Sequence, residues 1–293
     1  MRALRIGKAL LVAGAALVAS NHARADLKPK TKPGSSDDLR VSGLFQGVAN
    51  GGVGFLPRTA LLAGPGVVHL HEKPGDSIPA ADLTVVRLDV LVQALRLAPG
   101  ADGIVFICAD RWESFLPLEF INRVHPYLLL KYDGRKPAQG WPMFGPTEAI
   151  APYYCGSSPV LGPAVDTHIE FGEFDATQIV ELRAVNTRAR YAPFYDGPMT
   201  GLSIAASQGR KLFLRECNNC HQGPSGVGGN TSQRPFSLLE IHAALNTAYF
   251  RAFVRNPKKF YPLTVMPTHE YFTEDMMTQL IAFLSEAKAA GVN

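Results

Sequence analysis

Residues 217–221 read Cys217-Asn218-Asn219-Cys220-His221, and this stretch decides how the rest of the chain is interpreted. Two cysteines separated by two residues and followed at once by a histidine form the pattern typical of covalent haem attachment. Two thiols at this spacing can reach the two vinyl groups on one edge of a porphyrin, and the adjacent imidazole can reach the iron from one face. We therefore expect Cys217 and Cys220 to bind one haem c covalently and His221 to ligate its iron.

Three other kinds of site share this cysteine spacing and remain as alternatives. A zinc site needs four ligands, commonly from a second Cys or His pair, and no such pair is evident. A thioredoxin-like redox pair lies in a βαβ unit, whereas this motif follows a predicted helix and precedes a Gly-rich stretch over residues 223–229. A structural disulfide does not require the histidine that follows the second cysteine.

An electron-carrying haem usually has a methionine or a second histidine opposite its first ligand. Our candidate is Met266 in Val265-Met266-Pro267, because Pro267 stiffens the backbone beside it. An open five-coordinate iron is a further alternative. The rival ligands are Met276, Met277, His269 and His242.

The first 25 residues have the pattern of a secretory signal peptide. Arg2, Arg5 and Lys8 precede an apolar run over residues 9–19, and small residues surround a cleavage point after Ala25. The apolar run is shorter than the ~20 residues that span a bilayer. We expect a periplasmic protein with no transmembrane anchor, in a compartment where thiols oxidise; an uncleaved anchor is the alternative.

Composition indicates a globular protein and argues against a nucleic-acid partner. Of the 293 residues, 46% are hydrophobic and 18% are charged, which is enough apolar surface for a core and excludes a collagen-like or fully disordered chain. The formal charge of +4 arises in the signal segment, because that segment carries four basic residues and no acidic one. The remaining chain is balanced, and so lacks the basic excess that phosphate binding requires.

Changes in residue pattern along the chain predict two domains. A flexible leader over residues 26–40 precedes an α+β, mostly-β domain over 41–192, and a linker at 193–197 leads to a helical domain over 198–293. Alternating and β-branched runs predict strands at 67–71, 83–88, 103–108, 128–132, 168–171 and 179–182. Helical spacing predicts helices at 89–97, 200–215, 237–246 and 273–290.

Residues 198–293 resemble a class I c-type cytochrome domain, which is an all-α fold. The resemblance rests on Gly209 and Phe213 ahead of the Cys-x-x-Cys-His motif, on the segment from Pro257 to Met266, and on a terminal amphipathic helix. It implies one haem c with Met266 as the second axial ligand.

The same resemblance implies how the helices pack. In that family a glycine lets the first and last helices cross closely, and Gly209 has no Cβ to block the approach. Phe213 would then meet Leu280 or Phe283. A proline after the haem-binding histidine often braces it, and Pro235 is the candidate here.

Residues 60–185 resemble, more weakly, the molybdopterin-binding domain of sulfite-oxidase-type oxidoreductases. In that family a cysteine thiolate binds molybdenum, and Cys108 lies beside Asp110 and Trp112 where smaller members carry a scaffold strand. We expect a cofactor-free relative that serves for docking, with a bound molybdenum cofactor as the alternative. The stretches that carry the resemblance are 86–91, 102–106, 110–118, 128–137 and 145–152.

Cys108 and Cys155 are the two cysteines left over. In an exported protein an even remainder predicts a disulfide, which would stabilise the fold by roughly 3–4 kcal/mol in the chain-entropy model; buried thiols or a metal-bound thiolate are the alternatives. His69 and His71 share one face of a predicted strand, and Asp166, His168 and Glu170 share another. For both groups we prefer a surface or partner-contact role over metal binding.

These patterns together predict a periplasmic monohaem electron carrier whose N-terminal domain docks a redox partner. The partner would be a dehydrogenase, a terminal oxidase or another cytochrome. Two alternatives remain: a molybdenum oxidoreductase with a fused haem acceptor, and a haem module that binds a gas or peroxide.

Overall fold

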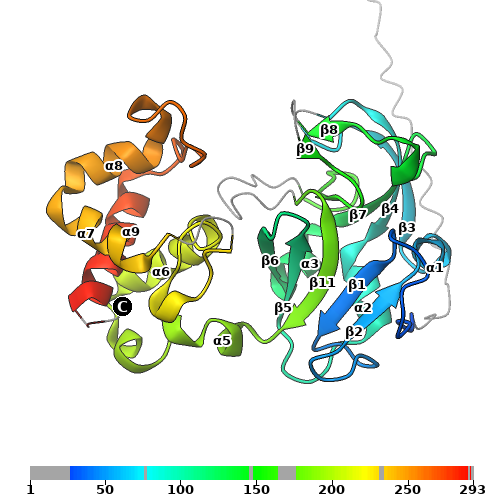
Figure 1. Ribbon diagram of the computed structural model, residues 1–293, viewed down its shortest axis with the longest axis horizontal. Helices are drawn as coiled ribbons and strands as arrows, with labels where there is room; N and C mark the ends of the chain where they lie inside the picture. The colour runs from blue at the N-terminus through cyan, green and yellow to red at the C-terminus, as the bar shows by residue number, and fades with distance from the viewer. Residues whose placement is uncertain are drawn as a thin grey trace, which may run out of the picture.

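The computed structural model describes residues 27–75, 78–144, 148–163, 176–230, 234–289 and 291. The predicted signal segment and the group Asp166, His168 and Glu170 lie outside the described residues. Figure 1 shows the sheets in one half of the molecule and most of the longer helices in the other, with the short helix α5 (Thr187–Arg190) between them. None of the helices in the described ranges is both long enough and apolar enough to cross a membrane.

The first half is built from two sheets. One sheet has five strands in the order β2-β1-β11-β5-β6, and the other has four in the order β10-β7-β4-β3, while β8 and β9 form a separate short pair. Strands β1 and β11 are parallel, and the other neighbours are antiparallel. The strands are β1 (Leu39–Gly43), β2 (Val53–Leu56), β3 (Val67–Glu72), β4 (Ala81–Arg87), β5 (Gly103–Cys108), β6 (Glu113–Pro117), β7 (Tyr127–Tyr132), β8 (Met143–Phe144), β9 (Glu148–Ala149), β10 (Cys155–Gly156) and β11 (Ile179–Val185).

Three helices are inserted between these strands: α1 (Arg58–Ala63), α2 (Leu88–Leu95) and α3 (Leu118–Val124). Helix α2 buries Leu88, Leu91 and Leu95, which recur at helical spacing and so form one apolar face. That face packs in one core with residues of the five-stranded sheet such as Ile104 and Leu182. The apolar helix face and the sheet face therefore bury each other.

The second half is dominated by α6 (Ile204–Glu216), α7 (Phe236–Leu245), α8 (Thr247–Arg255) and α9 (Glu274–Ala289). Helices α6 and α9 cross at Gly209, where an added Cβ would lie 1.9 Å from the Gln279 carbonyl oxygen. Beside the crossing, the rings of Phe213 and Phe283 lie 5.6 Å apart between centroids. The predicted close crossing and its aromatic neighbour are confirmed.

The predicted fold class is wrong. We expected a mostly-β α+β domain like the molybdopterin-binding fold and then an all-α class I cytochrome c domain, but the described residues form a mixed α/β structure with roughly 37% helix and 24% strand. Helices lie among the strands as well as after them, and isolated β-bridges join His221 to Arg234 and Gln222 to Gly228 within the second half. Periodicity did not reveal these features, because α1 and α3 are short and the bridges are made by loop backbone.

Individual elements agree better with the sequence. The strands predicted at 67–71, 83–88, 103–108, 128–132 and 179–182 correspond to β3, β4, β5, β7 and β11. The predicted helices correspond to α2, α6, α7 and α9, and Thr273 caps α9 through its hydroxyl, which accepts from Met276 N–H at 3.2 Å. The strand predicted at 168–171 lies outside the described residues.

Candidate functional site

The Cys-x-x-Cys-His motif begins where α6 ends. The Cys217 N–H donates to the Phe213 carbonyl (2.9 Å), and the N–H groups of Cys220 and His221 both donate to the Cys217 carbonyl, at 3.1 and 2.8 Å. These bonds coil the motif into one further turn after the helix. The turn directs both cysteines and the histidine to the wall of one cavity.

Glycines in the following loop let its backbone fold against the motif. Gly228 and Gly229 have φ values of +84° and +69°, a left-handed conformation that favours glycine. The Gly229 N–H donates to the Asn218 carbonyl (2.7 Å), and a Cβ on Gly228 would lie 2.4 Å from the same oxygen. The loop therefore packs directly on the motif.

The cavity beside the motif lies among α6, α7, α8 and α9. Its volume is about 170 Å³. Its walls are mainly apolar and aromatic. They are formed by Phe213, Glu216, Cys217, Cys220, His221, Leu239, His242, Tyr249, Phe250, Phe253, Val254, Tyr261, Met266, His269, Leu280 and Leu284.

The two motif cysteines are thiols and form no disulfide. Burial and the negative charge of Glu216 raise the pKa of the Cys217 thiol. A reactive thiolate needs a lowered pKa, so this environment disfavours a thioredoxin-like redox pair. The position of both cysteines at the wall of one cavity suits the formation of thioethers.

His221 is held as a neutral imidazole. Burial, followed by the nearby charges of Arg234 and His269, lowers the pKa of His221 to about 4. Its Nδ1 is buried and has no hydrogen-bond partner in the part of the chain that the structure describes. A metal-binding imidazole must be neutral, so His221 is in the protonation state that iron ligation requires. Pro235, the expected brace, begins α7 directly after Arg234, which forms the β-bridge with His221.

The cavity also contains three of the candidates for the second axial ligand, Met266, His269 and His242. Met266 is half-buried, and its N–H donates to the Thr264 hydroxyl at 3.2 Å. His269 is 4% exposed, and its Nδ1 lies 3.3 Å from the Val254 carbonyl, the kind of bond that orients a ligating imidazole. Burial lowers the pKa of His269. The structure thus places the predicted Met266 and the rival His269 on the same cavity as His221.

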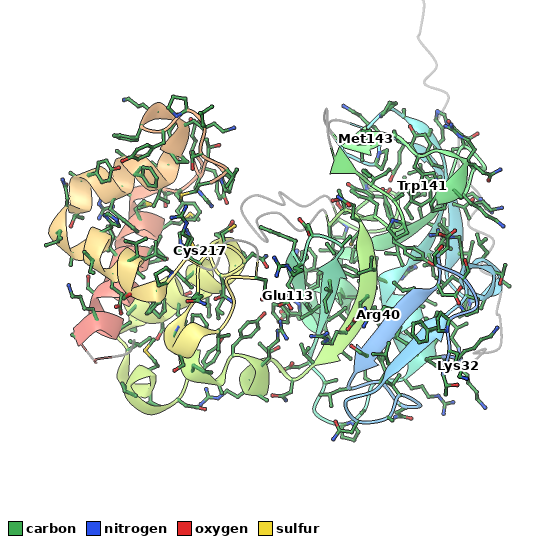
Figure 2. The ribbon with its side chains drawn as sticks, in the orientation of Figure 1. Lys32, Arg40, Glu113, Trp141, Met143 and Cys217 are labelled. Atoms are coloured by element: carbon green, nitrogen blue, oxygen red, sulfur yellow. The ribbon has the colours of Figure 1, made fainter. Side chains whose placement is uncertain are left out.

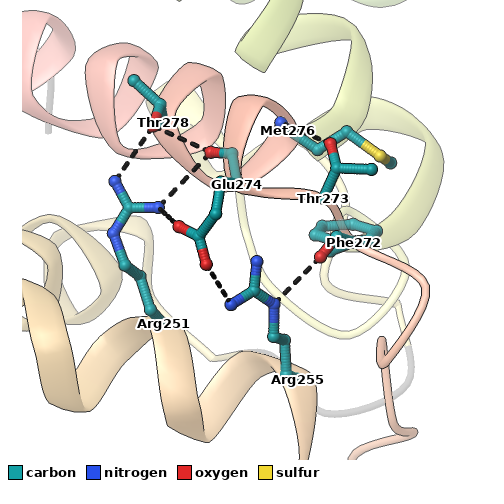
Figure 3. Close-up of polar contacts among 7 residues, drawn as sticks. All are labelled: Arg251, Arg255, Phe272, Thr273, Glu274, Met276 and Thr278. Carbon is teal, nitrogen blue, oxygen red and sulfur yellow. Dashed lines mark hydrogen bonds and ion pairs between the residues drawn. The ribbon is translucent and has the colours of Figure 1, made fainter.

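Charged contacts between α8 and α9 hold the loop that carries Met266 (Figure 3). Arg251 and Arg255 donate to the two carboxylate oxygens of Glu274, at 2.9 and 2.7 Å. The Nε of Arg255 also donates to the Phe272 carbonyl at 2.9 Å, and Arg251 reaches the Thr278 hydroxyl at 3.0 Å. The two ends of the loop over residues 256–273 are therefore tied together, which restricts where Met266 and His269 can lie.

The two methionine rivals lie in or against the helical core, whereas His242 lies at the cavity. Met277 is fully buried in the helical core, and Met276 packs against that core. His242 lies on α7 and also lines the cavity. The two methionines of α9 thus fill space between helices.

Sequence reasoning missed Glu216 and the aromatic wall of α8. The Glu216 side chain is 3% exposed, lines the cavity, and accepts a hydrogen bond from the Tyr271 hydroxyl at 2.7 Å. Nothing in the sequence marks Glu216, since its partner is remote in the chain. In α8, Tyr249 and Phe253 share one face at a spacing of one helical turn, and this signal was readable from the sequence.

The described N-terminal candidates make contacts within the sheet half. Cys108 and Cys155 are buried thiols in the same hydrophobic core and are not joined in a disulfide, an environment that suits core packing rather than a molybdenum ligand. His69 and His71 each contact the neighbouring strand β4, and His71 Nδ1 lies 2.7 Å from the Asp82 carboxylate. Among the described residues, no group of three His, Cys, Asp or Glu side chains is arranged to hold a metal ion.

Comparison with known proteins adds no relative: no protein-family model matches the chain, and no curated protein matches it.

Proposed function

We propose that this chain is a monohaem c-type electron carrier of the periplasm, which passes single electrons between a redox enzyme and a downstream acceptor. One observation carries the proposal: Cys217, Cys220, His221 and Met266 line a single apolar cavity, although Met266 is remote from the motif in the chain. Export rests on the N-terminal sequence pattern alone.

The residues around the cavity fit haem c. Bound haem c supplies a ferric/ferrous couple whose potential depends on its axial ligands and surroundings. Cys217 and Cys220 would anchor the ring through thioethers, and neutral His221 would ligate the iron. Met266 would provide a soft thioether ligand, which favours the ferrous state.

The cavity walls assist this chemistry by excluding water. Phe250 and Leu280 are buried, and Phe253 and Tyr249 enclose the side formed by α8. A low-dielectric wall disfavours the extra positive charge of ferric iron. The buried carboxylate of Glu216 acts in the opposite direction, so the haem potential would reflect both.

The test is whether the purified chain carries covalent haem. The protein should be produced in a bacterium that attaches haem c in its periplasm, then denatured and examined as the alkaline pyridine haemochrome. We expect one haem c per chain in the parent, and loss of one thioether bond in Cys220→Ala, visible as a shifted haemochrome band. Absence of haem from the parent would refute the proposal.

Metal analysis of the same sample separates the molybdenum alternative. The proposal expects iron in a one-to-one ratio with the chain and no stoichiometric molybdenum. Stoichiometric molybdenum would instead make the chain an oxidoreductase with its own haem acceptor.

A further inference from the structure

The haem-type motif is fastened to the edge of the five-stranded sheet. The Asn219 amide donates to the Glu113 carbonyl (2.6 Å) and its oxygen accepts from the Glu113 N–H (3.0 Å). Glu113 begins β6, the edge strand, so the Asn219 side chain pairs with an edge that would otherwise be open. Figure 2 shows Glu113 and Cys217 on the facing sides of the two halves.

Two further contacts hold the same junction. The carboxylate of Glu113 pairs with Arg190 of α5, and both side chains are largely buried. The rings of Phe115 and Tyr191 meet edge to face, 5.8 Å apart. Paired, buried charges and aromatic contact give this junction a defined geometry, so the distance between β6 and the motif is set by the fold.

Trp112 immediately precedes this junction. It ends the turn between β5 and β6, where Arg111 has a φ of +75° and the Trp112 N–H donates to the Asp110 carboxylate at 2.9 Å. A positive φ at a residue other than glycine costs energy and often marks a functional position. The turn thus fixes the backbone at Trp112, whose side chain is half-buried and packs against the core of the sheet half.

The surroundings of Trp112 connect the N-terminal half with the haem-type cavity. Trp112 lines two cavities, both of which also contain Arg215 from the last turn of α6. One of them is lined in addition by Glu216 and His269, and these two residues form part of the wall of the cavity that contains Cys217. Glu216 and His269 therefore border both a cavity beside Trp112 and the cavity that contains Cys217.

We propose that Trp112 is the residue through which electrons pass between the N-terminal half and the haem. This inference rests on the proposed function and adds a route to it. A reduced one-electron donor at the N-terminal half loses one electron, and the ferric iron gains it to become ferrous. The indole bridges the gap without being oxidised, and the Asn219–Glu113 pairing keeps the gap short.

Trp141 provides the matched control, because the chain contains two tryptophans. Its indole N–H donates to the Arg135 carbonyl at 2.9 Å, and Arg58 lies over its ring at 5.5 Å. Figure 2 shows Trp141 far from Cys217, on the outer side of the sheet half. A change at Trp141 removes the same aromatic surface without touching the junction.

The experiment attaches a ruthenium polypyridine photoreductant to one introduced cysteine and follows haem reduction after a light flash. The excited ruthenium(II) label gives up one electron and becomes ruthenium(III), while ferric iron becomes ferrous. Ala109→Cys places the label on the exposed turn beside Trp112, and Leu245→Cys places it on the exposed end of α7. The four native cysteines would not compete, because two are buried and two are thioethers.

We expect Trp112→Leu to slow reduction from position 109 several-fold, because the change removes the aromatic ring between the label and the haem. The same change should leave reduction from position 245 unaltered, and the matched control Trp141→Leu should alter neither rate. Trp112→Phe keeps an aromatic ring and should slow the reduction from position 109 less than Trp112→Leu. It replaces the leucine variant in the test if that variant does not fold. Equal rates in all variants, or equal slowing from both positions, would overturn the route.

The haem content of each variant keeps the two proposals separate. If the parent protein contains no haem c, the proposed function is refuted. If the parent contains haem c but its reduction rate from position 109 is the same with and without the Trp112 indole, only the proposed route is refuted.

Discussion

Substitution of Gly209 by alanine tests the helix crossing that holds the cavity together. An added Cβ would lie 1.9 Å from the Gln279 carbonyl oxygen, 2.5 Å from its carbon and 2.9 Å from the Phe283 Cβ, whereas real Cβ contacts essentially never fall below 3.0 Å. Two of these atoms are backbone and cannot rotate away. Helices α6 and α9 must therefore separate by about an ångström, which loosens the Phe213–Phe283 contact.

The expected magnitude follows from two opposing effects. Alanine in place of glycine improves helix propensity by about 1 kcal/mol. Overpacking in a close-packed core typically costs about 1–3 kcal/mol, sometimes more, and the backbone contact at Gly209 belongs at the upper end. We expect Gly209→Ala to lower the free energy of unfolding by about 2 kcal/mol.

The assay is urea unfolding of the purified protein, followed by helical circular dichroism. Gly201→Ala is the matched control, since a Cβ there has no atom within 4 Å, and we expect a change between zero and about +1 kcal/mol. If both variants unfold at the same urea concentration as the parent, helices α6 and α9 do not cross as closely as described.

Three further predictions concern the ligand, the loop and the junction. Met266→Ala should lower the haem reduction potential by roughly a tenth of a volt or more, within the ~0.8 V range that axial ligands span, and should let carbon monoxide bind the ferrous iron; an unchanged spectrum would mean that another residue is the ligand. Because the hydrogen bond from Arg255 lowers the pKa of the Glu274 carboxyl, the contribution of Glu274 to stability is present above its unfolded pKa of about 4.3 and is lost as pH falls through the lower folded value. Melting temperatures of the parent and Glu274→Gln should therefore differ near about pH 6 and converge near about pH 3; a constant difference would contradict this. Asn219→Ala leaves the backbone N–H and carbonyl of Glu113 without that amide, at a cost of about 1–3 kcal/mol, so limited proteolysis between the halves should accelerate, and an unchanged cleavage rate would show that the junction does not depend on this pairing.

Local chemistry was predictable from the sequence where it is contiguous or periodic. The Cys217–His221 motif needs only its spacing. The close approach at Gly209 was implied by the resemblance to class I cytochromes, and the absence of a Cβ at Gly209 suits it. Among the described strands, β3, β4, β5, β7 and β11 followed from alternation and β-branching, whereas the other six were not predicted. Each of these signals involves only a few residues close in the sequence, so it can be recognised without knowledge of the fold.

Long-range features were not predictable in the same way. The pairing of Asn219 with Glu113 joins a loop to a sheet edge across much of the chain, and no local pattern encodes it. The burial of Glu216 depends on Tyr271 in the same manner. The predicted fold class was wrong for the same reason. Helical periodicity after residue 198 suggested a separate all-α domain, whereas the motif is hydrogen-bonded to β6 through Asn219.

The most direct test of the account is the attachment of haem to the polypeptide. The purified chain should be denatured, extracted with acidified acetone, and weighed intact by mass spectrometry. The account predicts that the red colour stays with the protein and that the mass exceeds that of the chain by one haem. Passage of the colour into the acetone phase, with a polypeptide of unmodified mass, would contradict it.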